Sequence, residues 1–464
     1  MGTTEETQAD SGVAGDPLAG LSLASEAPIG WRITIVCSIV ALLETTAVGM
    51  AGGSLTAIQE TFGLSDTLAG LIPSAAVLGS LAAAVPSAHL ADNHKRVLVL
   101  GAAAVLWTLV VVGSALAPVF AVFLFTRVLL GAAGQLNNPA ASSLIADAHP
   151  ARARARAYGY ERMANYLGLP LGIAVGAALS DAFGWRTAFV VLAAPGVLAV
   201  LAVLTLREPA RGLGDMLDRR GRELPETAAA GDAPASADVE AGATDDDGDG
   251  RPPTIAQFRM LWAIPTMRIL LVGIPVLFSA LASLFFWSTA YFEEVHSLAE
   301  SEAGGIAGGV GGTGIVIGII IGSRMGDRHH GNRAGWRLRL AGTALLAGSA
   351  FFAAFVLLPS LPAQAAAFGM SNVFIAMAIP NLTAAVADVV PAHMRGMAFS
   401  SVQFLLAFGS AAGPPLVGAT SDLFGSLRPA MAVLLIPLAI SAEWVRRGAH
   451  RFDDDAEAVI SNAR

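Results

Sequence analysis

The chain has 464 residues, of which 54% are hydrophobic and only 14% charged, and its mean hydropathy is +0.62. Soluble domains carry about a quarter charged residues, so this composition excludes an ordinary soluble globular protein. The net charge of −8 argues against a nucleic-acid partner, and a single cysteine, Cys37, excludes internal disulfides and cysteine metal clusters.

The first 30 residues carry five acidic side chains and neither Lys nor Arg. A secretory signal needs a positively charged segment before its apolar stretch. We therefore expect residues 1–30 to form a disordered cytoplasmic tail.

Twelve apolar runs follow, each near the 20 residues that cross a bilayer as a helix. Lipid offers the backbone no hydrogen-bond partners, so runs of this length must be helices. The runs lie near 31–52, 67–90, 97–117, 119–146, 158–180, 186–206, 268–292, 303–322, 338–359, 364–387, 398–420 and 429–446.

A polar block rich in Pro, Ala, Gly and Asp separates the sixth run from the seventh. Such a composition buries too little apolar surface to fold alone. We predict an all-α membrane protein with a six-helix bundle at 31–206 and a second one at 265–447. An acidic cytoplasmic linker at 207–264 joins the bundles, and an acidic cytoplasmic tail covers 448–464.

The distribution of basic residues predicts the orientation. With the N-terminus inside, the outer loops contain only Arg186 and Arg428, whereas the inner loops are rich in Lys and Arg. Positive loops stay on the cytoplasmic side. We expect a multi-pass plasma-membrane protein, monomeric, with both termini in the cytoplasm.

The stretch 139–184 recurs without a gap as 380–425, a shift of 241 residues. IADAHPARARARAY and SDAFG in the first copy correspond to VADVVPAHMRGMAF and SDLFG in the second. A period of half the chain indicates two related halves in tandem and excludes a solenoid. The two bundles should therefore be pseudo-symmetric.

Several motifs resemble those of the major facilitator superfamily. AHLADNHKR at 88–96 is similar to its first inner-loop signature, SRMGDR at 323–328 to the equivalent loop of the second half, and RVLLGAAG at 127–134 to its span-four motif. GLPLGIAVG and GSAAGPPLVG resemble its antiporter-type glycine motif. The resemblance implies a secondary transporter that works by rocking two bundles about a midplane site.

Within that superfamily, IQETFGLSDTLAGLI, GWRTAF and LREPARG resemble Spinster-like lipid transporters. The acidic residues that this subfamily carries in spans one and four align here with Ala47 and Gly134. The resemblance therefore implies the fold, while the subfamily's proton-coupling residues are absent from these positions.

Two ionisable residues lie deep inside the apolar runs. Counting 1.5 Å per residue places Glu44 and Arg127 at similar depth in spans one and four. An isolated charge there is costly, which favours a pair. We predict that Glu44 binds the proton and that Arg127, released when Glu44 is protonated, binds an anionic substrate. The alternative is a permanent Glu44–Arg127 bridge that only joins two helices.

Amide side chains are weaker candidates for the substrate site: Gln135, Asn137, Asn138 and Asn381. Amides also hydrogen-bond between membrane helices, and for any one of them this alternative is favoured. Trp287, Tyr291 and Phe292 could shape an apolar part of the site, but an interfacial aromatic belt is the favoured interpretation.

Charged residues at the cytoplasmic helix ends are predicted to form ion pairs that close the inner side of the transporter. The candidates are Asp92, Arg96, Asp147, Arg154, Asp327, Arg328, Asp388 and Arg395. The alternative is that some of the arginines only set the topology.

Together these features predict a transporter of a small amphipathic or anionic organic compound, and the family resemblance implies export in exchange for protons. Alternatives are Spinster-like uptake or flipping of a lysolipid, and a membrane sensor that binds ligand without transport. No catalytic, metal or phosphate-binding motif is present, so we expect no enzyme activity, no cofactor and no metal. The expected partners are a small-molecule or lipid substrate, protons and the bilayer.

Overall fold

The computed structural model describes residues 25, 27–216, 254–329, 335–391 and 394–461. Within these ranges the secondary structure is helical, without strands, and twelve helices are long and apolar enough to cross a membrane. The predicted fold class is confirmed.

The first bundle contains six spanning helices. They are α1 (Arg32–Gly53), α3 (Asp66–Asn93), α4 (Arg96–Ala115), α5 (Phe120–Ala148), α6 (Ala151–Phe183) and α7 (Trp185–Leu204). A short helix, α2 (Leu55–Phe62), continues α1. The side chain of Ser65 caps α3 by accepting from the Leu68 N–H at 3.4 Å.

The second bundle repeats this order after a short helix, α9 (Thr254–Ala263). Its spans are α10 (Pro265–His296), α12 (Gly311–His329), α13 (Trp336–Leu357), α14 (Leu361–Asp388), α15 (Arg395–Phe424) and α17 (Leu435–Ser461). Before α12 come α11 (Glu300–Gly305) and the π-helical turn η1 (Ile306–Val310), and α16 (Leu427–Val433) precedes α17.

Repeat-equivalent glycines allow close helix contacts inside each bundle. Gly172 of α6 lies against the backbone of Thr46 in α1, and Gly413 of α15 lies against the backbone of Ser279 in α10. Neither position leaves room for a Cβ atom. Small residues let membrane helices approach this closely, and the 241-residue shift relates the two glycines.

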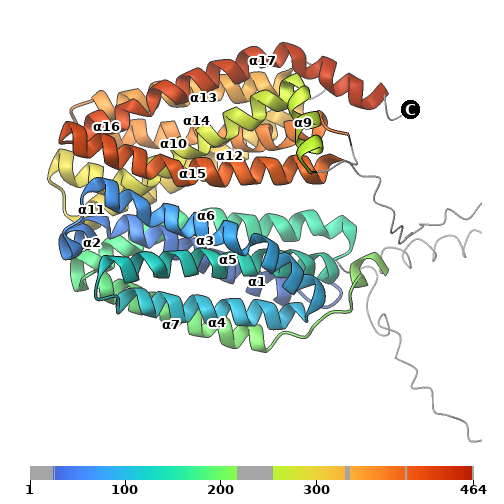
Figure 1. Cartoon of the computed structure of the whole chain (residues 1–464), viewed down its shortest axis with the longest axis horizontal. Coiled ribbons are helices and arrows are strands. Elements are labelled where there is room, and N and C mark those ends of the chain that lie inside the picture. Colours follow the sequence, from blue (N-terminus) through green and yellow to red (C-terminus); the bar gives the residue numbers. More distant parts are fainter. Residues whose placement is uncertain (1–24, 26, 217–253, 330–334, 392–393, 462–464) are drawn as a thin grey trace, which may run out of the picture.

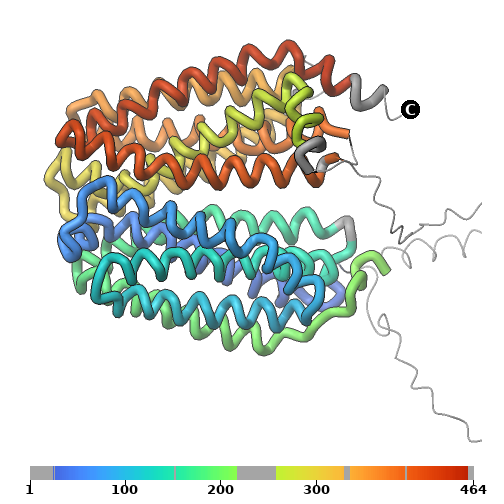
Figure 2. The backbone as a smooth tube through the Cα atoms, in the orientation of Figure 1, coloured from blue at the N-terminus to red at the C-terminus, as the bar shows by residue number. Residues whose placement is uncertain are grey.

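The two bundles lie side by side and touch at one end only (Figures 1 and 2). We call the end with α2, α11 and α16 the distal end, and the end where α1 begins and α17 finishes the terminal end. At the distal end Gly70 of α3 lies against Pro415 of α15. Towards the terminal end the facing side chains are exposed: Val85 of α3 by 80% and Phe408 of α15 by 63%.

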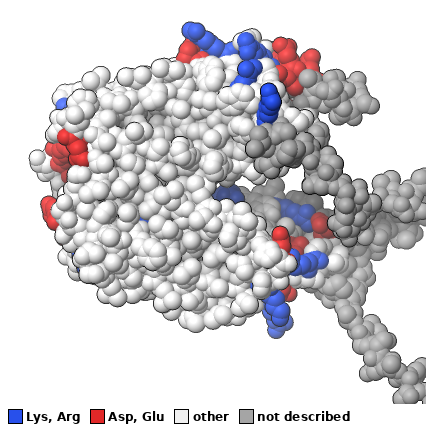
Figure 3. Space-filling model, in the orientation of Figure 1, with Lys and Arg blue, Asp and Glu red and all other residues white. Residues whose placement is uncertain are grey.

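Figure 3 shows the same asymmetry in space-filling form. A hollow separates the bundles on the right, where Lys and Arg side chains gather, and the left side is closed. The structure is therefore open at the terminal end.

The polar segments next to the bundles are more ordered than the composition indicates. Residues 205–216 lie against the first bundle, where Arg211 donates to the Ala91 and His94 carbonyls at 2.9 Å. Helix α17 continues past residue 448, with Phe452 buried and Asp455 accepting from the Thr266 N–H at 2.8 Å. Residues 1–24 and 217–253 lie outside the described ranges, so the tail and most of the linker stay predictions.

Candidate functional site

A cavity of about 230 Å³ lies between the bundles. Helices α1, α3, α5 and α6 line one side, and α10 and α15 line the other. The lining is apolar except for the hydroxyls of Ser80 and Ser410 and the carboxylate of Glu44. The cavity is thus an apolar site with one ionisable side chain.

Glu44 is held by its neighbours on α5. The Asn137 Nδ2 donates to the Glu44 Oε2 at 3.3 Å, and the carboxylate occupies the space that a side chain at Gly134 would need. Among the described residues no Lys, Arg or His forms an ion pair with Glu44. The carboxylate is therefore available to a proton or to a cationic ligand.

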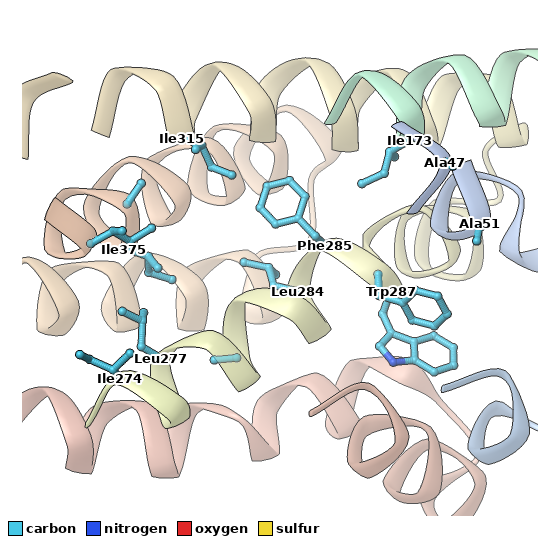
Figure 4. Packing of buried hydrophobic residues seen from close by; sticks show 14 of the residues in the cluster. Ala47, Ala51, Ile173, Ile274, Leu277, Leu284, Phe285, Trp287, Ile315 and Ile375 are labelled. Carbon is cyan, nitrogen blue, oxygen red and sulfur yellow. The ribbon is translucent and has the colours of Figure 1, made fainter. Parts of the chain in front are cut away.

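Glu44 of α1 shares the cavity with Phe285 of α10. Both residues line the cavity, together with the adjacent Phe286. Figure 4 shows the Phe285 ring on one side of α10 and the Trp287 ring on the other. The site thus has a carboxylate on one wall and an aromatic ring on the other.

Arg127 lies elsewhere, so the predicted Glu44–Arg127 pair is wrong. The guanidinium carbon is 4.7 Å and 5.0 Å from the ring centroids of Phe123 and Phe189, and Arg127 donates to the Ser114 hydroxyl. The error comes from helix length. Helix α5 has 29 residues, which places Arg127 roughly 30 Å from its terminal end, whereas Glu44 is roughly 18 Å along α1.

A second polar cluster lies at the terminal end of the first bundle. Buried Arg96 forms ion pairs with Asp147 and, at 2.9 Å, with Glu208, and it donates to the Pro209 carbonyl at 2.9 Å. Asp147 also accepts from the Gly212 N–H at 3.0 Å. The cluster fastens the segment after α7 to the bundle.

Glu208 lies beyond the spans, at the edge of this cluster. Partial burial opposes its charge, but the Val97 N–H and the side chain and N–H of Arg96 donate to it and hold the pKa of Glu208 below its usual value. Glu208 is therefore anionic throughout the physiological pH range.

The second bundle contains the matching pair, Arg337 with Asp388, and Arg337 also lies 3.6 Å from Asp327. Arg337 was missed in the sequence, although the 241-residue shift that relates Asp147 to Asp388 also relates Arg96 to Arg337. Applying the shift to every charged residue would have found it.

Comparison with known proteins identifies the family. The model of the Major Facilitator Superfamily matches residues 37–414 and 312–457. The chain belongs to this superfamily. It is thus a multi-pass membrane transporter, as the motifs predicted.

Individual relatives match in part. The 4-hydroxybenzoate transporter PcaK of Pseudomonas aeruginosa is 31% identical over 209 residues, or 45% of this chain and 46% of that protein. Protein spinster homolog 1 of Mus musculus is 32% identical over 184 residues, or 39% and 35%. The chain thus aligns with less than half the length of these curated relatives.

Two solved structures match nearly the whole chain. A bacterial homolog of the human lysosomal transporter Spinster, inward-facing and unoccupied, has a TM-score of 0.76 at 21% identity and covers 92% of this chain and 98% of its own. A D-xylose-proton symporter has a TM-score of 0.65 at 17% identity, with coverages of 89% and 97%. At this identity the likeness concerns the fold of the superfamily.

The amide candidates separate into one neighbour of the cavity and three others. Asn137 contacts Glu44, whereas Asn381 donates to the Gly322 and Met377 carbonyls at 3.0 and 2.9 Å and so joins α14 to α12. Gln135 is half-buried and Asn138 exposed, and neither lines the central cavity. Asn381 therefore forms a hydrogen bond between two helices, which is the alternative favoured from the sequence.

Trp287, Tyr291 and Phe292 form neither an interfacial belt nor a cavity wall. All three are fully buried inside the second bundle, where Tyr291 and Phe292 pack against Phe355. Trp287 donates to the Pro414 carbonyl at 3.0 Å. Their position near the end of an apolar run resembled a belt, but the helix face that carries them points inward.

Where the predicted gating residues form ion pairs in this structure, both partners belong to the same bundle. Arg154 bonds Asp215 at 2.5 Å, and the Arg96 and Arg337 pairs are described above. Asp92 and Arg328 are exposed and form no ion pair among the described residues, and the Arg395 side chain lies outside them. Because the bundles are apart at the terminal end, an ion-pair gate between them stays a prediction.

Proposed function

We propose that the chain is a proton-coupled exporter of a small amphipathic organic compound in the plasma membrane. The observation that supports this most is the single carboxylate, Glu44, in an otherwise apolar cavity between the two bundles.

A buried carboxylate in a membrane protein is costly unless a proton or a cation neutralises it. Among the residues that the structure describes, no Lys, Arg or His lines the cavity, so an anionic substrate would find no side chain of opposite charge there. An amphiphile that is neutral or positively charged fits better, because Phe285 and Phe286 offer apolar surface and aromatic faces that attract cations. We therefore replace the anionic substrate of the sequence interpretation with a neutral or cationic one.

The proposed exchange follows from competition for Glu44. A proton bound from outside would be carried inward, and its release would restore the carboxylate for a substrate taken from the cytoplasm. Since proton and substrate cannot both occupy the carboxylate, each one would drive the other across. This is antiport, and the net result is efflux.

The proposed orientation places the terminal end in the cytoplasm. Basic residues at or beyond the terminal ends of the helices, among them Lys95 before α4, Arg154 in the first turn of α6 and Arg211 after α7, lie there. The state described above is then inward-open, with the cavity accessible from the cytoplasm.

The proposal is tested by flux in proteoliposomes with an imposed pH gradient. The probe panel contains a lipophilic amine, a neutral amphiphile, an aromatic acid and a lysolipid. We expect amine transport that depends on the gradient, loss of that dependence in Glu44→Gln, and retention in the cavity control Ser410→Ala. A Glu44→Gln protein with unchanged gradient dependence would rule out Glu44 as the coupling group, and movement of the lysolipid alone would favour Spinster-like lipid transport.

A further inference from the structure

At the distal end a carboxylate of the second bundle binds the start of a helix in the first. Asp422, near the end of α15, accepts from the N–H groups of Asp66 and Thr67 at 2.9 Å each and from the Thr67 hydroxyl at 2.5 Å. The first N–H groups of a helix have no partner within it. Asp422 thus caps α3 across the bundle interface.

The opposite side of the interface has a matching contact. Asp181, near the end of α6 in the first bundle, accepts from the Ser301 hydroxyl at 2.5 Å. Ser301 lies in the first turn of α11, which leads into the second span of the second bundle. Here the first bundle supplies the carboxylate and the second bundle a serine hydroxyl in the first turn of a helix.

The two aspartates are repeat-equivalent, because Asp181 and Asp422 differ by the 241 residues that separate SDAFG from SDLFG. Their helices, α6 and α15, hold the same place in the two bundles. The contacts are therefore related by the pseudo-two-fold axis. Each bundle supplies the aspartate of one contact and the hydrogen-bond donors of the other.

Close contacts between helices of the two bundles lie beneath both aspartates. On one side the Ser74 hydroxyl of α3 donates to the Ala411 carbonyl of α15 at 2.5 Å. On the other, Gly304 of α11 lies against Ala177 of α6 with no room for a Cβ atom. Both contacts join the two bundles, and each aspartate lies at the distal edge of one of them. These contacts would be lost if the bundles separated at the distal end.

We propose that Asp181 and Asp422 are a symmetric pair of latches that hold the distal end of the transporter shut. Each latch is a carboxylate of one bundle bound to a helix start of the other, so both must break before the distal end opens. Hydrogen bonds to an ionised acceptor and the positive end of a helix both stabilise the closed state. The residues act on the equilibrium between the two open states and do not contact the cavity.

The test measures that equilibrium with spin labels at the distal end. Labels at Leu116, which follows α4, and at Leu357 of α13, both exposed, report the separation of the bundles after buried Cys37 is replaced by Ala. Asp422→Asn and Asp181→Asn should each raise the ratio of distal-open to distal-closed molecules about tenfold, which corresponds to losing about 1.4 kcal/mol. The double variant should raise it further.

Two variants separate latching from general damage. Ser301→Ala leaves the Asp181 carboxylate in place but removes its partner, and it should reproduce the shift of Asp181→Asn. Glu302→Gln neutralises an exposed acid on the same surface and should leave the distances unchanged. If the single and double Asn variants all keep the wild-type distance distribution, the latch proposal is wrong.

Discussion

Gly134 controls the position of the one carboxylate in the cavity. A Cβ atom there would collide with the Glu44 carboxyl group, which is the movable end of a flexible side chain. Gly134→Ala should therefore leave the protein folded but displace the carboxylate and break its bond to Asn137. Losing a hydrogen bond to a charged group costs about 1.5–3 kcal/mol, so we expect roughly a tenfold or larger rise in the transport KM.

The matched control for this substitution is Gly159→Ala on α6, where an added Cβ meets open space. Flux and thermal unfolding would be measured for both. Unchanged transport by the Gly134→Ala protein would show that the carboxylate position does not matter.

At the residue scale the sequence shows that a carboxylate lies inside a membrane span, but it does not show which residue that carboxylate contacts. Glu44 stands out because an acidic residue interrupts an apolar run. Its pairing with Arg127 failed because the two depths were counted from opposite surfaces of a core about 30 Å thick. Helix α5, with 29 residues, is longer than such a core requires, so Arg127 lies nearer its distal end than that count indicated. Contacts between bundles, such as Asp422 with Thr67, join residues more than 350 positions apart and leave no local pattern.

At the element scale, the crossing of α1 and α6 depends on Gly172. Replacing an exposed helical Gly with Ala improves helix propensity by about 1 kcal/mol. At Gly172 the new Cβ would instead meet the backbone of α1, and overpacking costs about 1–3 kcal/mol. Gly172→Ala should lower the free energy of unfolding and Gly159→Ala should raise it.

Thermal unfolding in detergent checks these opposite signs. Gly413→Ala, the repeat equivalent in α15, should behave like Gly172→Ala, with Gly396→Ala as its control in open space. A stabilising Gly172→Ala would contradict the close backbone contact.

The stability that Glu208 contributes by fastening the segment after α7 should depend on pH. Because the folded-state pKa of Glu208 lies below its usual value of 4.5, its contribution is complete above about pH 4.5 and is lost as the pH falls through the folded pKa. The difference in melting temperature between wild type and Glu208→Gln should be constant from pH 8 to about pH 5 and shrink under more acid conditions. A difference that grows on acidification would have the wrong sign.

At the scale of the whole molecule, composition and the 241-residue repeat predict the twelve spans and the two bundles, because both depend on the chain alone. The conformational state is not predictable in this way. The distal-open and terminal-open states consist of the same helices. They differ in whether α3, α6, α11 and α15 meet at their distal or at their terminal ends. The order of the segment after α7 was missed for a related reason, because its partners belong to folded helices.

The repeat equivalence of Asp181 and Asp422 bears on how such a protein could have arisen. In a symmetric dimer of two identical six-helix chains, one aspartate per chain would form both latches, since every contact in such an interface occurs twice. Duplication and fusion would preserve the latches without any new residue. Glu44 has no acidic counterpart in α10, where the offset of 233 residues between the starts of α1 and α10 pairs it with Leu277, so the two halves share their latches but differ in the chemistry that they bring to the cavity.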